Sequence, residues 1–225
     1  MQYSELIDEL QLHREEAFAN FQRKLIFTSQ TILGVRTPTL RKIAKKYRGD
    51  IQTLFSFPDE FYEVAFIKLT AVSALPYEQL LLWIDKCVAL MDNWATCDSF
   101  KCNCIKAHKD AFLPVIERIF QRGGEYEQRY PLVVLLSYYA EERYIPVIKR
   151  FLAGADTSRY YVSMAAAWLT TEILIKRFND GVEILKSGIL DTKTHDKAIQ
   201  KAIESYRINI EKKELLRSLK INKVR

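Results

Sequence analysis

Residues that break helices are scarce in this sequence. Only 7 of the 225 residues are glycine and 6 are proline, and no stretch alternates apolar with polar side chains as a half-buried strand does. Leu, Ile, Ala, Lys and Glu are common instead, and these residues favour helices. The composition therefore excludes a turn-rich β architecture and predicts an all-α chain.

Long apolar runs are missing as well. No uncharged apolar stretch reaches the roughly 18 residues that a membrane-spanning helix needs. The first residues also lack the basic segment followed by an apolar run that marks a signal peptide. We therefore expect a soluble, cytoplasmic protein without a membrane partner.

Common catalytic and nucleotide-binding signatures are absent, including glycine-rich phosphate loops, GxSxG and HExxH. The 3 histidines form no recognisable triad order with Ser or Cys. The four cysteines have spacings that match no common zinc-ligand pattern; they are Cys87, Cys97, Cys102 and Cys104. We therefore expect reduced, buried thiols, with no metal and no cofactor.

Apolar residues recur at helical spacing almost throughout the chain. Helices are expected within 4–27 and near 37–47, 59–72, 77–91, 92–106, 109–122, 126–140, 142–152, 157–177, 179–187, 192–207 and 210–220. Asp92 is the expected cap of the helix 92–106. Pro131 is expected to start the regular helix near Tyr130, with Arg129 at its N-terminal edge.

The connections between these segments are short, which makes neighbouring helices antiparallel. Repeated pairs of this size predict a HEAT- or armadillo-like α-solenoid of stacked antiparallel helix pairs. Such a stack has a concave face that binds extended partners. We predict that residues 1–225 form a single domain of this kind.

The chain is basic, with a formal net charge of +6, and a basic balance favours a polyanionic partner such as nucleic acid. Two groups of cations stand out. One lies on the expected helix 37–47 and the other in the C-terminal part of the chain; they comprise Arg41, Lys42, Lys45 and Lys46, and Lys193, Lys197, Lys201 and Arg207. Both phosphate contact and a solvated helix face account for such groups.

Four further residues have side chains suited to chemistry. Trp94 and Asp98 lie one helical turn apart, and a carboxylate beside an indole suits a cation or a cationic transition state. A core tryptophan with a capping aspartate fits the same spacing. Arg129 suits a phosphate, or an ordinary ion pair. Trp168 suits a stacking platform or a core position.

Together these segments resemble the AlkD-like DNA alkylation repair family. The resemblance spans nearly the whole chain. It is carried by Gly34-Val-Arg-Thr-Pro38 with Leu40-Arg41, by Asn93-Trp-Ala-Thr-Cys-Asp98, by Trp168 in its alanine-rich helix, and by Ser205-Tyr-Arg-Ile208.

The resemblance implies HEAT-like repeats that bind duplex DNA on a concave basic face, to which Arg36 would also contribute. It implies a monomeric DNA glycosylase that removes positively charged N3- or N7-alkylated purines, with Trp94, Asp98, Arg129 and Trp168 as the catalytic cluster. In this reading Asp98 stabilises the oxocarbenium-like sugar and orients the attacking water.

Two departures from the family pattern keep alternatives open. No Lys or Arg occurs between Tyr160 and Ile175, and Leu25 stands where an early aromatic residue is expected. Both features weaken the expected grip on DNA. A non-catalytic DNA-binding relative and a HEAT-type protein-interaction scaffold are therefore the alternatives to an active glycosylase.

Overall fold

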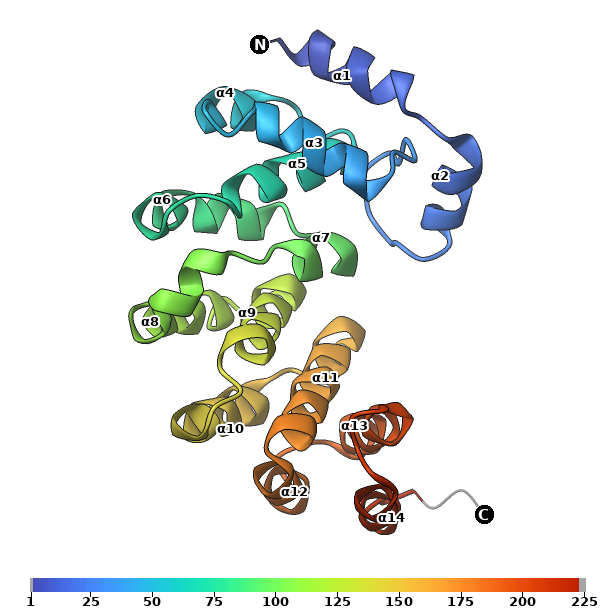
Figure 1. The fold of residues 1–225 in the computed structure, drawn as a ribbon, viewed down its shortest axis with the longest axis vertical. Helices are drawn as coiled ribbons and strands as arrows, with labels where there is room; N and C mark the ends of the chain where they lie inside the picture. The colour runs from blue at the N-terminus through green and yellow to red at the C-terminus, as the bar shows by residue number, and fades with distance from the viewer. Residues whose placement is uncertain (1, 223–225) are drawn as a thin grey trace. The chain divides into compact units, whose positions relative to one another are not determined.

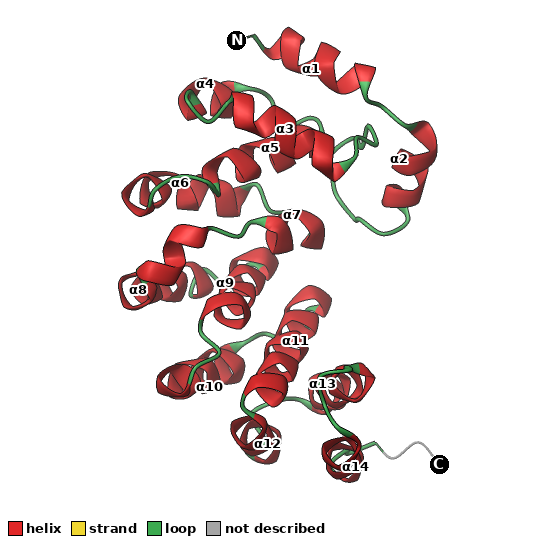
Figure 2. Ribbon diagram, in the orientation of Figure 1, coloured by secondary structure: helices red, strands yellow, loops and turns green. Residues whose placement is uncertain are grey.

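A computed structural model describes residues 2–222 of the chain, and every named element in this range is helical (Figures 1 and 2). The only β feature among these residues is an isolated bridge between Thr31 and Phe61. The predicted all-α class is therefore confirmed. The chain forms two compact units, Met1–His108 and Lys109–Arg225, while the prediction of a single domain over 1–225 stays a prediction.

The first unit is organised around a buried central helix, α5. All but one of the residues of α5 are buried, including the charged Glu63 and Lys68, so the helix is enclosed on every side. Helices α3, α4, α6 and α7 each pack against it. The elements of this unit are α1 (Tyr3–Leu12), α2 (Glu16–Arg23), α3 (Thr37–Lys46), α4 (Ile51–Ser56), α5 (Tyr62–Val72), α6 (Tyr77–Ala89), α7 (Trp94–Ser99) and the 3₁₀ helix η1 (Asn103–Ala107).

The second unit is a two-layer stack of helices. Helices α9, α11 and α13 pack against one another in chain order, and α8 and α10 cover α9 while α12 covers α11 and α14 covers α13. This is the layering that the predicted solenoid requires. The elements are α8 (Lys109–Phe120), α9 (Glu125–Tyr138), the 3₁₀ helix η2 (Glu142–Tyr144), α10 (Ile145–Gly154), α11 (Tyr160–Lys176), α12 (Phe178–Lys186), α13 (Thr192–Glu204) and α14 (Ile210–Ser218).

Two local predictions are wrong. Asn93, not Asp92, caps α7 by accepting a hydrogen bond from the Thr96 amide, because the Asp92 carboxylate is bonded to another loop. Helix α9 begins at Glu125 and contains Pro131, so Arg129 lies inside the helix and not at its edge. Residues 128–136 of α9 are buried throughout, and this packing outweighs the one backbone hydrogen bond that proline removes.

The structure also describes the cysteines, the apolar character of the helices and the grouping of potential metal ligands. None of the four cysteines forms a disulfide, and Cys87, Cys97 and Cys102 are buried. Burial raises the pKa of the Cys87 and Cys102 thiols, so they stay protonated and unreactive. Within residues 2–222, no helix combines the length and the apolar character that crossing a bilayer requires. The described residues also contain no group of His, Cys, Asp and Glu side chains arranged to hold a metal ion.

Candidate nucleic-acid interface

Helix α7 carries the predicted pair Trp94 and Asp98, and the α2–α3 loop (residues 24–36) fixes its beginning. The indole Nε1 of Trp94 donates a hydrogen bond of 2.9 Å to the carbonyl oxygen of Leu25. Trp94 is partly exposed, so it is not the buried core tryptophan that its spacing also allowed. One edge of the ring is held while part of its surface stays accessible.

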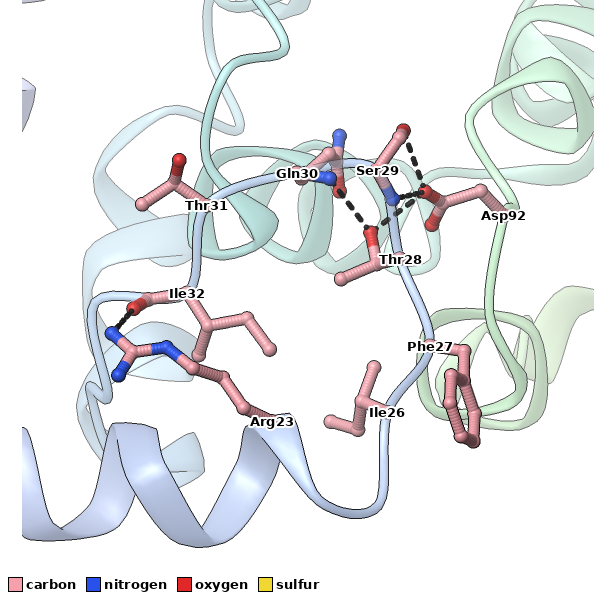
Figure 3. Close-up of a pocket in the computed structure, with 9 residues that line it drawn as sticks. All are labelled: Arg23, Ile26, Phe27, Thr28, Ser29, Gln30, Thr31, Ile32 and Asp92. Atoms are coloured by element: carbon pink, nitrogen blue, oxygen red, sulfur yellow. Dashed lines mark hydrogen bonds between the residues drawn. The ribbon is translucent and has the colours of Figure 1, made fainter.

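The residue before the cap of α7 strengthens this attachment (Figure 3). One carboxylate oxygen of Asp92 accepts hydrogen bonds from Thr28 Oγ1 at 2.7 Å and from the Ser29 amide at 2.9 Å. Burial of this carboxyl opposes its ionisation, but hydrogen bonds from Thr28, Asn93 and Ser29 outweigh burial and lower the pKa of Asp92. Asp92 therefore stays charged at neutral pH and holds the loop.

The other end of the α2–α3 loop is held from within the core. Glu63 on α5 is fully buried, and its carboxylate accepts hydrogen bonds from the amides of Leu33 at 3.1 Å and Gly34 at 2.8 Å. Gly34 has a φ of 87°, a left-handed conformation that glycine adopts without cost. The loop is thus tied both to α5 and to α7.

Asp98 lines a hollow of about 420 Å³ in the first unit. Its walls come from α3, α5 and α7 and from the residues that follow α3 and α7. The lining residues are Arg41, Lys45, Arg48, Phe66, Thr70, Ser73, Asp98, Ser99 and Lys101. Four cations and several hydroxyl groups therefore surround a single carboxylate.

The cations of this hollow are not paired with carboxylates of residues 2–222. Arg41, Lys45 and Arg48 recur at helical spacing along α3 and its extension, and all are exposed. Among residues 2–222, neither these three nor Lys101 lies within ion-pair distance of a carboxylate. Lys46, by contrast, is paired with Glu9 on α1. Unpaired cations that line one concave surface attract a polyanion.

The other predicted cations of the first unit lie in different settings. Arg36 is exposed but engaged, because its guanidinium bonds the Glu15 carboxylate at 2.7 Å and lies 4.0 Å from the centre of the Phe18 ring. Lys42 is exposed on α3 but does not line the hollow. Of the predicted DNA contacts on α3, the structure therefore brings Arg41 and Lys45 together with Asp98.

Arg129 and Trp168 belong to the second unit. Arg129 is only 5% exposed, and its Nη1 atom donates a hydrogen bond of 2.7 Å to the carbonyl oxygen of Tyr161 in the first turn of α11. Trp168 lies two turns further along α11 and is partly exposed. That Arg129 and Trp168 act with Trp94 and Asp98 stays a prediction.

The C-terminal cations of the second unit divide into two kinds. Lys193 and Lys197 are exposed on α13, and Lys201 is partly exposed. Arg207 donates to the mostly buried Glu172 carboxylate at 2.9 Å. Arg207 therefore attaches its segment to α11 through hydrogen bonds to Glu172. Lys193, Lys197 and Lys201 on α13 remain accessible to solvent.

The prediction from sequence missed two of the four cations of the hollow, Arg48 and Lys101. Arg48 continues the row of Arg41 and Lys45 by three residues, so extending the helical periodicity past Tyr47 would have found it. Lys101 has no local signal, because it reaches the hollow only through the turn that follows α7. Both residues enlarge the basic surface beside Asp98.

Comparison with protein-family models matches residues 6–213 to the family described as DNA alkylation repair enzyme. The chain belongs to the DNA alkylation repair family. A search of the curated proteins found no match. Membership of this family gives the protein a role in DNA repair.

Proposed function

We propose that this protein is a DNA glycosylase that excises positively charged N3- or N7-alkylated purines from duplex DNA. The observation that carries the proposal is the hollow in which Asp98 faces four cations. The cations suit the phosphates that flank a lesion, and the carboxylate suits the positive charge that develops on the sugar.

The reaction needs no acid to protonate the base. Alkylation at N3 or N7 leaves the purine cationic, so the C1′–N9 bond breaks with its electron pair moving to the base, which departs neutral. The sugar becomes oxocarbenium-like, and Asp98 stabilises that charge. Water then adds to C1′ and loses its proton, with the Asp98 carboxylate or bulk water as acceptor.

The two tryptophans and Arg129 have supporting roles in this proposal. The accessible surface of Trp94, fixed by its bond to Leu25, offers a π face to the cationic lesion or sugar. From the second unit, Arg129 contributes a phosphate contact and Trp168 a stacking face, with Lys193, Lys197 and Lys201 along the backbone. Duplex DNA with an alkylated purine is the proposed partner of a monomeric protein.

The test is release of 7-methylguanine from a duplex that carries it, followed by chromatography of the free base. We expect wild-type protein to release this cationic base but not a neutral lesion such as 1,N⁶-ethenoadenine, because the proposed site supplies no general acid. Absence of release at high enzyme concentration would reject the glycosylase and leave DNA binding without catalysis as the better account.

One observation favours that second candidate function. The face of α11 around Trp168 carries no Lys or Arg from Tyr160 to Ile175, and Arg129 already bonds the Tyr161 carbonyl. A relative that binds DNA through the basic hollow, without cutting it, fits these features. Measuring DNA affinity together with base release separates the two functions.

The cations of the hollow should set the salt dependence of DNA binding. Each phosphate neutralised contributes about −0.9 to the slope of log K against log salt. We therefore expect Arg48→Ala and Lys101→Ala each to make this slope shallower by about 1. Fluorescence anisotropy between low and moderate salt measures it.

The matched control for this experiment is Lys86→Ala, which removes a cation of the same unit that lies over the Trp83 ring and not in the hollow. Its slope should equal that of the wild type. Equal slopes for all four proteins would show that the hollow does not contact phosphates.

A further inference from the structure

The α2–α3 loop displays a large aromatic side chain that the described residues, 2–222, leave mostly exposed. Phe27 is 72% exposed, whereas its neighbour Ile26 is 7% exposed. Figure 3 shows the two side chains pointing to opposite sides of the loop. Ile26 therefore anchors the loop in the core, and the Phe27 ring is held out from it.

The backbone on both sides of Phe27 is fixed, so the ring has little freedom to withdraw. Two residues before it, the Leu25 carbonyl accepts the hydrogen bond from Trp94. Immediately after it, Thr28 and Ser29 donate to the Asp92 carboxylate (Figure 3). An exposed ring on a rigid support loses little conformational entropy when it makes a contact.

The attachments also place Phe27 at a definite site. Both lead to the beginning of α7, the short helix that carries Trp94 and, one turn later, Asp98. The ring thus belongs to the same local structure as the proposed glycosylase site. Phe27 and Asp98 are thus attached to the two ends of the same short helix.

The surroundings of the ring indicate the chemistry of its partner. Residues 24–31 supply one cation, hydroxyl groups and an amide. Asp92, the one acidic residue that lines the same pocket, is engaged by hydrogen bonds from Thr28 and Ser29. An aromatic ring among cationic and hydroxyl groups is the composition of a nucleic-acid surface, where bases stack on aromatic side chains. A protein partner would need a far larger apolar area than one projecting ring supplies.

We propose that Phe27 stacks on a nucleobase that the lesion has left unpaired or poorly stacked in the damaged duplex. The inference rests on the proposed function, because it assigns Phe27 to the same DNA site. Phe27 is then a positioning residue that recognises distortion of the duplex, while Asp98 acts on the sugar. Such stacking is most favourable where pairing is already lost.

The test uses DNA that already contains a tetrahydrofuran abasic analogue, so it needs no catalysis. Dissociation constants are measured by anisotropy for this duplex and for an intact duplex of the same sequence. We expect Phe27→Ala to weaken binding to the abasic duplex by about 5-fold or more and to the intact duplex by less than about 2-fold. Phe27→Tyr, which keeps the ring, should match the wild type.

The control is Leu12→Ala, which removes another exposed apolar side chain, 83% exposed at the end of α1, and should leave both affinities unchanged. Equal affinities of wild type and Phe27→Ala for the abasic duplex would overturn the proposal. Equal losses of affinity on both duplexes would also overturn it. Anionic lipid vesicles are a further probe, and a loss of affinity for these vesicles without a loss for either duplex would overturn the proposal as well. A Phe27 effect without base release by the wild type would reject the glycosylase alone.

Discussion

We expect the Asp98→Asn variant to release 7-methylguanine from duplex DNA about 100-fold more slowly than the wild type. Asparagine keeps the shape of the side chain but removes the negative charge that faces the developing oxocarbenium. Single-turnover base release with enzyme in excess measures the chemical step and avoids product release. A smaller change would mean that the flanking cations and tryptophans contribute most of the rate.

The reason to expect so large an effect lies in the composition of the hollow. Asp98 is the only carboxylate among its lining residues, against four cations, so no neighbouring acid in this hollow replaces its charge. Binding to undamaged DNA should stay the same or improve slightly, because the variant removes repulsion between a carboxylate and phosphates. A change in rate without a loss of affinity therefore identifies a catalytic role.

Glu78→Gln is the matched control for this variant. It replaces a carboxylate by an amide at an exposed position in the first turn of α6, outside the hollow. Its rate of base release should equal that of the wild type. If both variants release base at the wild-type rate, Asp98 has no catalytic charge role even though the protein is active.

The second large effect concerns stability. Replacing Gly34 by Ala should lower the free energy of unfolding by about 2–5 kcal/mol, as the sum of left-handed backbone strain and overpacking. At a φ of 87° a side chain is strained, and the new Cβ would lie 2.4 Å from the Glu15 carbonyl oxygen and 2.6 Å from the Ala19 nitrogen. These are backbone atoms of α2 and its cap, so they cannot rotate aside.

Gly123→Ala separates strain from steric overlap. Gly123 has a φ of 80° but no atom within 4 Å of the position that a Cβ would take, so only the strain of roughly 1–2 kcal/mol applies. Urea unfolding followed by circular dichroism gives both values. Equal losses in the two variants would show that α2 moves away from Gly34 at no cost.

Local signals predicted much of the fold. Helical periodicity found α5, and Thr37-Pro38 marked the start of α3. Sequence reasoning missed α4, whose six residues are too short to show a period, although Asp50 caps it by accepting from the Thr53 amide. It also predicted Asp92 as a helix cap, whereas Asp92 accepts a hydrogen bond from Thr28, a residue 64 positions away in the sequence. Such pairings depend on tertiary structure and leave no local pattern.

The residues of the candidate site were likewise predictable only where they lie close together on one helix. Arg41 and Lys45 share a helix face, and Trp94 and Asp98 share a turn, so helix geometry alone groups each pair. What helix geometry does not provide is the packing of α3 and α7 on α5, which brings Asp98 to the same hollow as Arg41. Lys101 joins the hollow through a turn and Phe27 stands out on a loop, and neither position follows a period.

The buried Glu63 has a further consequence for the proposed contact between this protein and DNA. Its carboxylate already accepts hydrogen bonds from the consecutive amides of Leu33, Gly34 and Val35. Consecutive backbone amides elsewhere bind phosphate directly, but here an internal acid fills that place. In the proposed complex, phosphate contacts in this part of the chain therefore fall to exposed side chains such as Arg41 and Lys45. We expect such contacts to be independent of base sequence and to weaken as ionic strength rises.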